Sequence, residues 1–149
     1  MHTLVRIASL AALAGALAAG AGCSALEGSA KYEATGQQVR LDGSREVPPV
    51  ATSAYGTGTV NIAPDRSVAV TLSVVDMTAT AAHIHEGAAG TNGPVIVPLA
   101  KISDNAFVAP DGARLTEAQY ASYKAGNLYV NVHSARFPGG EVRAQIAGR

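Results

Sequence analysis

The sequence contains no tryptophan, only two phenylalanines and a single cysteine among its 149 residues. Because large aromatic side chains are scarce, the core of a folded domain must consist mainly of Val, Ile, Leu and Ala. A single cysteine excludes a framework of intrachain disulfides. The formal net charge is zero, and no basic cluster stands out, which argues against binding to nucleic acid.

Apolar runs are also scarce beyond the N-terminus. Residues 7–22 consist of Ala, Leu, Gly, one Ile and one Ser, and they follow Arg6. This run is shorter than the roughly 20 apolar residues that a membrane-spanning helix needs, and it ends in small residues. We therefore interpret residues 1–22 as a secretory signal peptide and expect the protein to be exported.

Cys23 stands where this apolar run ends, in Gly20-Ala21-Gly22-Cys23-Ser24. The motif resembles a bacterial lipobox, in which the cysteine is lipidated, although Gly20 replaces the larger aliphatic residue usual at its position. We expect a lipoprotein of the outer membrane or cell surface, facing the periplasm or the exterior, that contacts membrane only through its anchor. The alternative is ordinary signal cleavage, which would leave a free thiol in an oxidising compartment. Residues 23–38 then form the lipidated cysteine and a flexible tether.

The rest of the chain, residues 39–149, reads as one domain rich in β-strands. Short segments alternate apolar with polar residues and are separated by turn residues, most clearly at 39–42, 58–62, 67–74, 95–97, 129–133 and 142–146. Pro64-Asp65 and Phe137-Pro138-Gly139-Gly140 predict reversals between neighbouring strands. This pattern predicts an all-β, antiparallel sandwich rather than an α/β fold.

One helix is expected within this domain. Thr116 is a suitable N-cap, Gln119 completes a capping box, and Gly126 is placed to end the helix. The predicted helix is short, from about Glu117 to Ala125, and we interpret it as a connection between strands.

Beyond the signal peptide the chain has only three histidines, which lie in the two motifs His83-Ile84-His85 and Tyr129-Val130-Asn131-Val132-His133. Residues two apart on a strand face the same side of a sheet, so His83 and His85 share a face. Alternation with the apolar residues places Asn131 and His133 on the face away from the core, together with Glu141 and Arg143 of the last strand. If the strands are neighbours, His133 pairs with Glu141 or Arg143 and the histidines gather.

Two interpretations of this polar face remain open. In the first, His83, His85 and His133 bind copper or zinc as neutral imidazoles, and Glu86 or Glu141 supplies an oxygen ligand or fixes a tautomer. Asn131 and Arg143 would then surround the site. In the second, the histidines only brace the loop 86–94 through backbone hydrogen bonds, while Arg143 and Glu141 form a surface ion pair.

Other chemistry finds little support in the sequence. Ser134 follows His133 directly, so the two side chains would point to opposite faces, and no Gly-x-Ser-x-Gly elbow is present. The glycines at 87–90 lack the lysine and the strand-to-helix setting of a phosphate-binding loop. The spacing of Asp104, Asn105 and Asp111 fits no EF-hand.

Five ordered sequence blocks, at residues 41–50, 82–87, 92–95, 126–133 and 138–146, resemble the CHRD domain, over about residues 39–147. That family is named after repeats in chordin, an extracellular antagonist that sequesters growth factors, and its bacterial members are secreted or lipid-anchored. The resemblance implies an exported antiparallel sandwich of immunoglobulin-like or superoxide dismutase-like type. The domain is also distantly similar to copper-zinc superoxide dismutase, which holds copper through a His-x-His strand pair. A full zinc ligand set and a bridging histidine are missing.

We therefore expect a binding module, not an enzyme, with a copper or zinc site made by the three histidines. The alternative is an envelope structural or protein-interaction domain in which the histidine cluster only braces the fold. A superoxide dismutase-like redox enzyme ranks third. Glu46 belongs to the first of the five blocks, and a contact with Arg143 is the one role that we can suggest for it.

Overall fold

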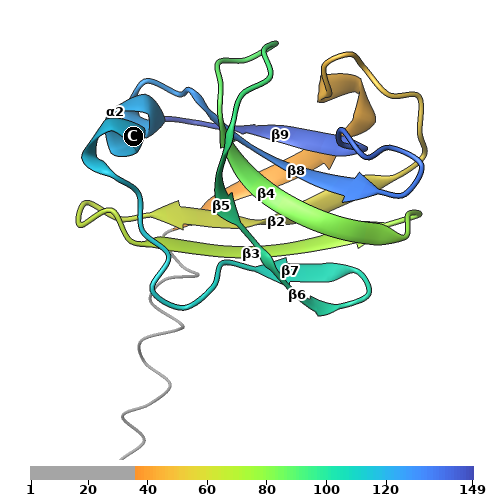
Figure 1. Ribbon diagram of the computed structural model, residues 1–149, viewed down its shortest axis with the longest axis horizontal. Helices are drawn as coiled ribbons and strands as arrows, with labels where there is room; N and C mark the ends of the chain where they lie inside the picture. Colours follow the sequence, from red (N-terminus) through yellow and green to blue (C-terminus); the bar gives the residue numbers. More distant parts are fainter. Residues whose placement is uncertain (1–35) are drawn as a thin grey trace, which may run out of the picture.

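A computed structural model describes residues 36–149 (Figure 1). The expected signal peptide, Cys23 and most of the tether lie outside these residues. The described elements are β1 (Gln37–Asp42), η1 (Gly43–Arg45), β2 (Tyr55–Ile62), β3 (Val68–Val75), β4 (Ala79–Glu86), β5 (Val95–Pro98), β6 (Ala100–Ser103), β7 (Ala106–Val108), α2 (Glu117–Lys124), β8 (Leu128–Ser134) and β9 (Val142–Ile146). Because β1 begins at Gln37, the last two residues of the expected tether belong to the sheet.

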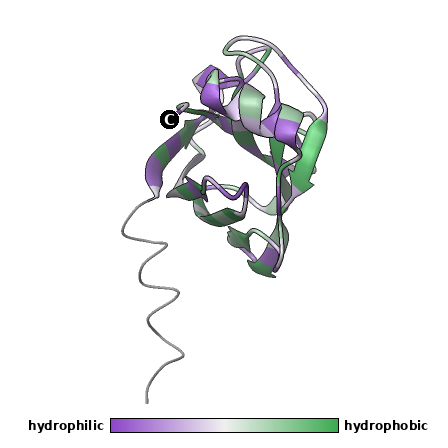
Figure 2. Ribbon diagram, turned by 90° about the vertical axis from the view of Figure 1, so that its left-hand side faces the viewer, coloured by the Kyte–Doolittle hydropathy of each residue, from purple (hydrophilic) through white to green (hydrophobic). Residues whose placement is uncertain are grey.

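All nine strands are hydrogen-bonded into one sheet, in the order β5-β4-β8-β9-β1-β2-β3-β7-β6, and all their pairings are antiparallel. The predicted all-β antiparallel class is confirmed. Only Leu99 separates β5 from β6, although these strands form the two edges of the sheet. The sheet must therefore curl until its edges approach each other, as the view in Figure 2 shows.

The curled sheet has two layers, with β4, β8 and β9 in one and β2 and β3 in the other (Figure 1). Between them lies a core of mostly aliphatic side chains, as the composition predicts, with Phe107 as its one phenylalanine. Leu41, Ile84 and Val130 are fully buried. Burial of each such side chain stabilises the fold by about 1.5–3 kcal/mol.

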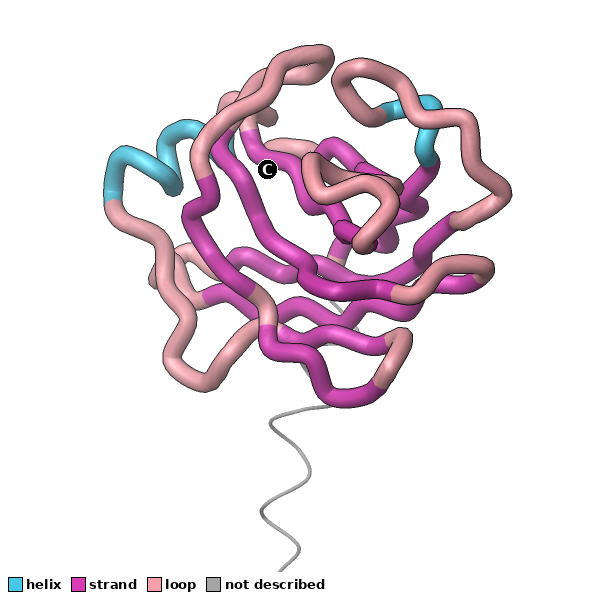
Figure 3. Tube along the Cα trace, turned by 45° about the vertical axis from the view of Figure 1, so that its right-hand side comes forward, coloured by secondary structure: helices cyan, strands magenta, loops and turns pink. Residues whose placement is uncertain are grey.

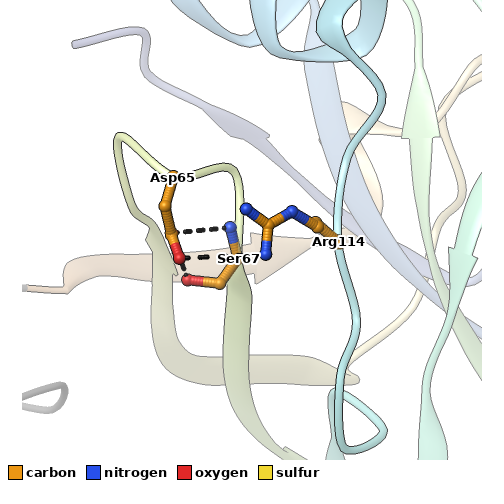
Figure 4. A network of polar contacts seen from close by, with 3 residues as sticks. All are labelled: Asp65, Ser67 and Arg114. Carbon is orange, nitrogen blue, oxygen red and sulfur yellow. Dashed lines mark hydrogen bonds and ion pairs between the residues drawn. The ribbon is translucent and has the colours of Figure 1, made fainter.

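The hairpin between β2 and β3 turns at the predicted site. Asp65 accepts hydrogen bonds from the backbone N–H and the hydroxyl of Ser67, at 3.0 and 2.7 Å, and forms an ion pair with Arg114 (Figure 4). The Ser67 hydrogen bonds hold the pKa of the Asp65 carboxyl below its usual value. These contacts fix the turn at the end of the molecule where the chain passes from β7 towards α2.

The helix α2 agrees with its sequence signals. Thr116 and Gln119 form the predicted capping box, and Gly126 adopts a φ of +76° just after the C-cap. Tyr123 anchors the helix to the core. Within residues 36–149 no helix has the length and hydropathy to cross a membrane.

Candidate metal centre

The polar residues of three neighbouring strands lie on the face of the sheet opposite the core. In the register, Asn131 of β8 stands between His83 of β4 and Arg143 of β9, and Tyr129 stands between His85 and Gln145. We call this surface the histidine face and define it by six residues: His83, His85, Tyr129, Asn131, His133 and Arg143. The predicted hairpin of β8 and β9 is confirmed, β4 is the other neighbour of β8, and continuing the β8–β9 register by one residue places His133 opposite Glu141.

The three histidines gather on this face. One ring nitrogen of each lies within 4.8 Å of one ring nitrogen of each of the other two. His83 Nδ1 and His133 Nε2 are 2.9 Å apart, and the rings of His83 and His85 meet edge to face with centroids 5.6 Å apart. Residues from β4 and β8, about 50 positions apart in the sequence, thus direct imidazoles towards a common point.

Backbone contacts define the tautomers of two of these rings. His85 Nδ1 lies 2.9 Å from the carbonyl oxygen of Gly93, and His133 Nδ1 lies 3.0 Å from that of Pro138. A carbonyl oxygen only accepts, so each Nδ1 carries the proton and each Nε2 of the neutral ring keeps a lone pair. His83 Nδ1 then donates to His133 Nε2. The arrangement of His85 and His133 is usual for metal-binding histidines, in which the ring nitrogen that does not bind the metal donates to a carbonyl or carboxylate.

Burial favours the neutral form of two of the three rings. His85 and His133 are each 8% exposed. Burial, together with the neighbouring imidazoles of His133 and His85, lowers the pKa of His83 to about 4. Burial also lowers the pKa of His133, against the opposing hydrogen bond to Pro138. Both rings are therefore neutral at pH 7, which is the state that binds metal ions.

Unsatisfied polar atoms concentrate at this place. Among the described residues, three buried side-chain atoms lack a hydrogen-bond partner, namely His85 Nε2, Asn131 Oδ1 and Glu46 Oε1. Buried polar groups normally have partners, since leaving one without a partner costs about 1–3 kcal/mol. Two of the three atoms belong to the histidine face, and His85 Nε2 is one of the candidate metal-ligand atoms.

A stack of three side chains lies beneath the cluster. The Arg143 guanidinium carbon is 3.3 Å from the centre of the Tyr129 ring, and that ring is nearly parallel to the His85 ring, with centroids 4.7 Å apart. Arg143 is only 1% exposed and donates to the carbonyl of Thr91 at 2.7 Å and to Asn92 Oδ1 at 3.2 Å. The surface ion pair suggested between Arg143 and Glu141 is therefore wrong: Arg143 is buried and turns towards the loop.

Two loops bury the histidine face, which the alternation pattern alone suggested would be turned outwards. Residues 87–94 are held by Arg143 and His85, and the Gly93 N–H donates to the Tyr129 hydroxyl at 3.2 Å. Asn92 Nδ2 donates to the carbonyl of Val47 at 2.7 Å and so joins this loop to residues 43–54. Figure 3 shows the two loops facing each other at the top of the view.

The two carboxylates that the sequence offered as ligands or tautomer-fixing partners have other partners. Glu141 Oε1 accepts from the Thr52 hydroxyl at 2.8 Å, and Glu86 accepts from Ser122. Among the described residues, no carboxylate belongs to the group of three histidines. The partners that fix the imidazole tautomers are instead the carbonyls of Gly93 and Pro138.

Glu46 is the residue that sequence reasoning placed least well. It is buried against Asn131 and Arg143, and burial raises its pKa to about 7, although Arg143, Asn131 and the Val47 backbone act in the opposite direction. Glu46 and Arg143 interact electrostatically, since each shifts the pKa of the other, but no hydrogen bond or ion pair joins these two described residues. Nothing in the local pattern around Glu46 indicated that its carboxyl would be buried.

The comparison with known families agrees with this architecture. The family model for the CHRD domain matches residues 37–146, which is nearly all of the described chain. No curated protein and no solved structure matches the sequence. The match covers the strands that build the histidine face, and the chain belongs to the CHRD domain family.

Proposed function

We propose that the protein is a metal-binding module that holds one copper or zinc ion through His83, His85 and His133. The observation that carries this proposal is the convergence of three imidazole nitrogens within 4.8 Å of one another. Around a tetrahedral zinc with Zn–N bonds of about 2.0–2.1 Å, ligand nitrogens stand roughly 3.3 Å apart. Small side-chain rotations would bring the three rings to that spacing.

Three further features support a metal site. The neutral state of His83 and His133, the protons fixed on Nδ1 of His85 and His133, and the partnerless His85 Nε2 all favour coordination. A bound ion would satisfy the buried lone pair of His85 Nε2. It would also replace the hydrogen bond between His83 and His133 with two coordinate bonds, after the proton of His83 moves from Nδ1 to its other ring nitrogen.

A second function has its own observation. The Nδ1 atoms of His85 and His133 hold the loop 87–94 and the turn before β9 in place, so the histidines also brace the fold. In this alternative the protein is an envelope structural or protein-interaction domain, and the histidine cluster binds no metal ion.

We also propose that the protein is exported and anchored to the membrane by a lipid on Cys23. Support comes from the N-terminal sequence alone, because residues 1–35 lie outside the described part of the chain. Mass spectrometry of the protein purified from membranes would detect an acylated Cys23 as the first residue. An unmodified N-terminus after ordinary cleavage would contradict this proposal.

The metal site is tested by calorimetric titration with Cu(II) and with Zn(II) at neutral pH. The full-length protein should carry Cys23→Ser, so that the only thiol is absent, and be kept in detergent because of its apolar N-terminus. We expect one ion per chain. The variants His85→Asn and His133→Asn place an amide NH₂ where Nδ1–H stood and delete Nε2, so they keep the brace and remove the ligand.

The two functions predict different results for these variants. A metal site predicts that both variants lose metal binding while the metal-free protein keeps its unfolding midpoint. A bracing role predicts no metal binding in any form, with a large loss of stability only in His85→Ala and His133→Ala. If wild type binds no ion more tightly than millimolar, the metal proposal fails.

A further inference from the structure

We propose that this site prefers monovalent copper, Cu(I), over Cu(II) and Zn(II), with His83, His85 and His133 as its three ligands. This inference rests on the proposed metal function and adds the charge of the ion that the site selects.

The donor set itself carries no negative charge. Its three members are neutral imidazoles, and among residues 36–149 no carboxylate joins them. Glu141 and Glu86, the two acidic residues nearest along the strands, are hydrogen-bonded to Thr52 and Ser122 instead. The groups that fix the rings of His85 and His133 are backbone carbonyls, which are dipoles without net charge. The ligands would therefore not neutralise the charge of a bound ion.

Two buried charged side chains flank the cluster: Glu141, which stands opposite His133 in the strand register, and Arg143. The Arg143 guanidinium is stacked on Tyr129, which is stacked on His85, so a cation lies two layers below one ligand ring. Its hydrogen-bond acceptors, the Thr91 carbonyl and Asn92 Oδ1, are neutral. Glu46 is the carboxyl that interacts with Arg143, and its own burial disfavours the charged form, so it offsets the guanidinium only in part.

Charge then decides between the ions. The cost of moving an ion from water into a medium of low dielectric constant rises with the square of its charge, so a divalent ion loses about four times as much as a monovalent one. Cu(II) and Zn(II) normally recover this cost through anionic ligands or additional ligands. The histidine face supplies neither of these, and the positive field of Arg143 disfavours the divalent ions further.

Coordination number points in the same direction. Structural zinc sites are almost always four-coordinate. Cu(I) forms stable complexes with only two or three ligands, so three imidazoles in a trigonal arrangement satisfy it. The two rings that are 8% exposed, His85 and His133, lie under the loop 87–94 and the turn at Pro138, which limits the access of solvent ligands.

The test compares three ions on the full-length Cys23→Ser protein. Cu(I) is supplied without oxygen in the presence of ascorbate and competed with bicinchoninate, while Cu(II) and Zn(II) are competed with chelators of known affinity. We expect Cu(I) to bind more tightly than either divalent ion by at least about tenfold, which corresponds to roughly 1.4 kcal/mol. His85→Asn serves as the matched control and should remove the binding of Cu(I).

A variant of the stack probes the cause. Arg143→Gln removes the positive charge but keeps an amide donor towards the Thr91 carbonyl, and we expect it to narrow the preference for Cu(I) by strengthening Cu(II) binding. If Cu(II) or Zn(II) binds wild type as tightly as Cu(I), the preference is overturned and the metal function stands. If no ion binds in a manner that depends on His85, both the preference for Cu(I) and the proposed metal-binding function are overturned.

Discussion

Gly140 lies against Glu46 so closely that a Cβ at position 140 would stand 2.4 Å from Glu46 Oε1. The same Cβ would stand 2.6 Å from Asn131 Nδ2, and Gly140 adopts a φ of +130°, a conformation that other residues rarely adopt. The buried carboxyl of Glu46 and the turn before β9 therefore fit together only because position 140 has no side chain.

Replacing this glycine should destabilise the domain. We expect Gly140→Ala to lower the free energy of unfolding by about 2–4 kcal/mol, through the clash and the backbone strain. Urea denaturation followed by circular dichroism measures the change. Gly139→Ala is the matched control, since a Cβ at position 139 meets nothing within 4 Å, and it should stay close to wild type. Equal stability of the two variants would contradict the packing described for Glu46.

The buried Glu46 should make stability depend on pH. Burial raises its pKa in the folded protein from 4.5 to about 7, so the folded state holds a proton that the unfolded state releases between these values. Below pH 4.5 the carboxyl is protonated in both states, so its burial does not lower the free energy of unfolding. As the pH rises from 4.5 to 7, the free energy of unfolding falls. We expect the unfolding free energy of Glu46→Gln, relative to that of wild type, to rise by roughly 2 kcal/mol between pH 4 and pH 8.

Measuring both proteins at each pH isolates this effect. The lowered pKa values of His83 and His133 act on stability with the opposite sign, but both histidines are common to the two proteins and cancel in the difference. A difference in unfolding free energy that stays constant from pH 4 to pH 8 would show that Glu46 titrates normally in the folded protein.

Arg143 should not be replaceable by lysine. Arg143→Lys keeps the charge but loses the planar stack on Tyr129 and one of the two hydrogen bonds to the loop 87–94. We expect a loss of about 2–4 kcal/mol in unfolding free energy, as for other damage to a buried polar network. Arg40 offers a control, because its guanidinium lies 5.0 Å from the Tyr55 ring in an exposed setting. Arg40→Lys should leave the denaturation midpoint nearly unchanged.

A bound metal should stabilise the fold. An ion that binds only the folded state at 100 times its dissociation constant raises the unfolding free energy by about 2.7 kcal/mol. We therefore expect copper to raise the thermal midpoint of wild type and to leave that of His83→Ala unchanged. His83 is the most exposed of the three histidines, and among the described residues its one hydrogen bond is to His133, so this variant should fold. An equal rise of the thermal midpoint in both proteins would show that copper binds at a site that does not involve His83.

Alternation alone predicted which residues of each strand lie on the histidine face, but not that β4 pairs with β8. Val130 and Val132 had to face the core, which placed Asn131 and His133 on the other face, and the His-x-His pair of β4 obeyed the same rule. The limits of the helix followed from Thr116, Gln119 and Gly126 because capping is a local property of the chain.

The burial of that face could not be predicted in the same way. It depends on the loops 43–54 and 87–94, whose residues have no periodic pattern and whose positions depend on contacts far along the sequence, such as Asn92 with Val47. The strands β6 and β7 were also missed. All four residues of β6 are exposed, so it shows no alternation, and β7 has only three residues.

The position of β1 has a consequence for how the chain folds. The strand lies between β2 and β9, the last strand, and Asp42 pairs with Arg143 about a hundred residues later. A sheet joined through its first and last strands cannot be completed hairpin by hairpin as the polypeptide is synthesised. Its pairings of high sequence separation predict slow folding that is completed only after the whole domain has emerged from the ribosome.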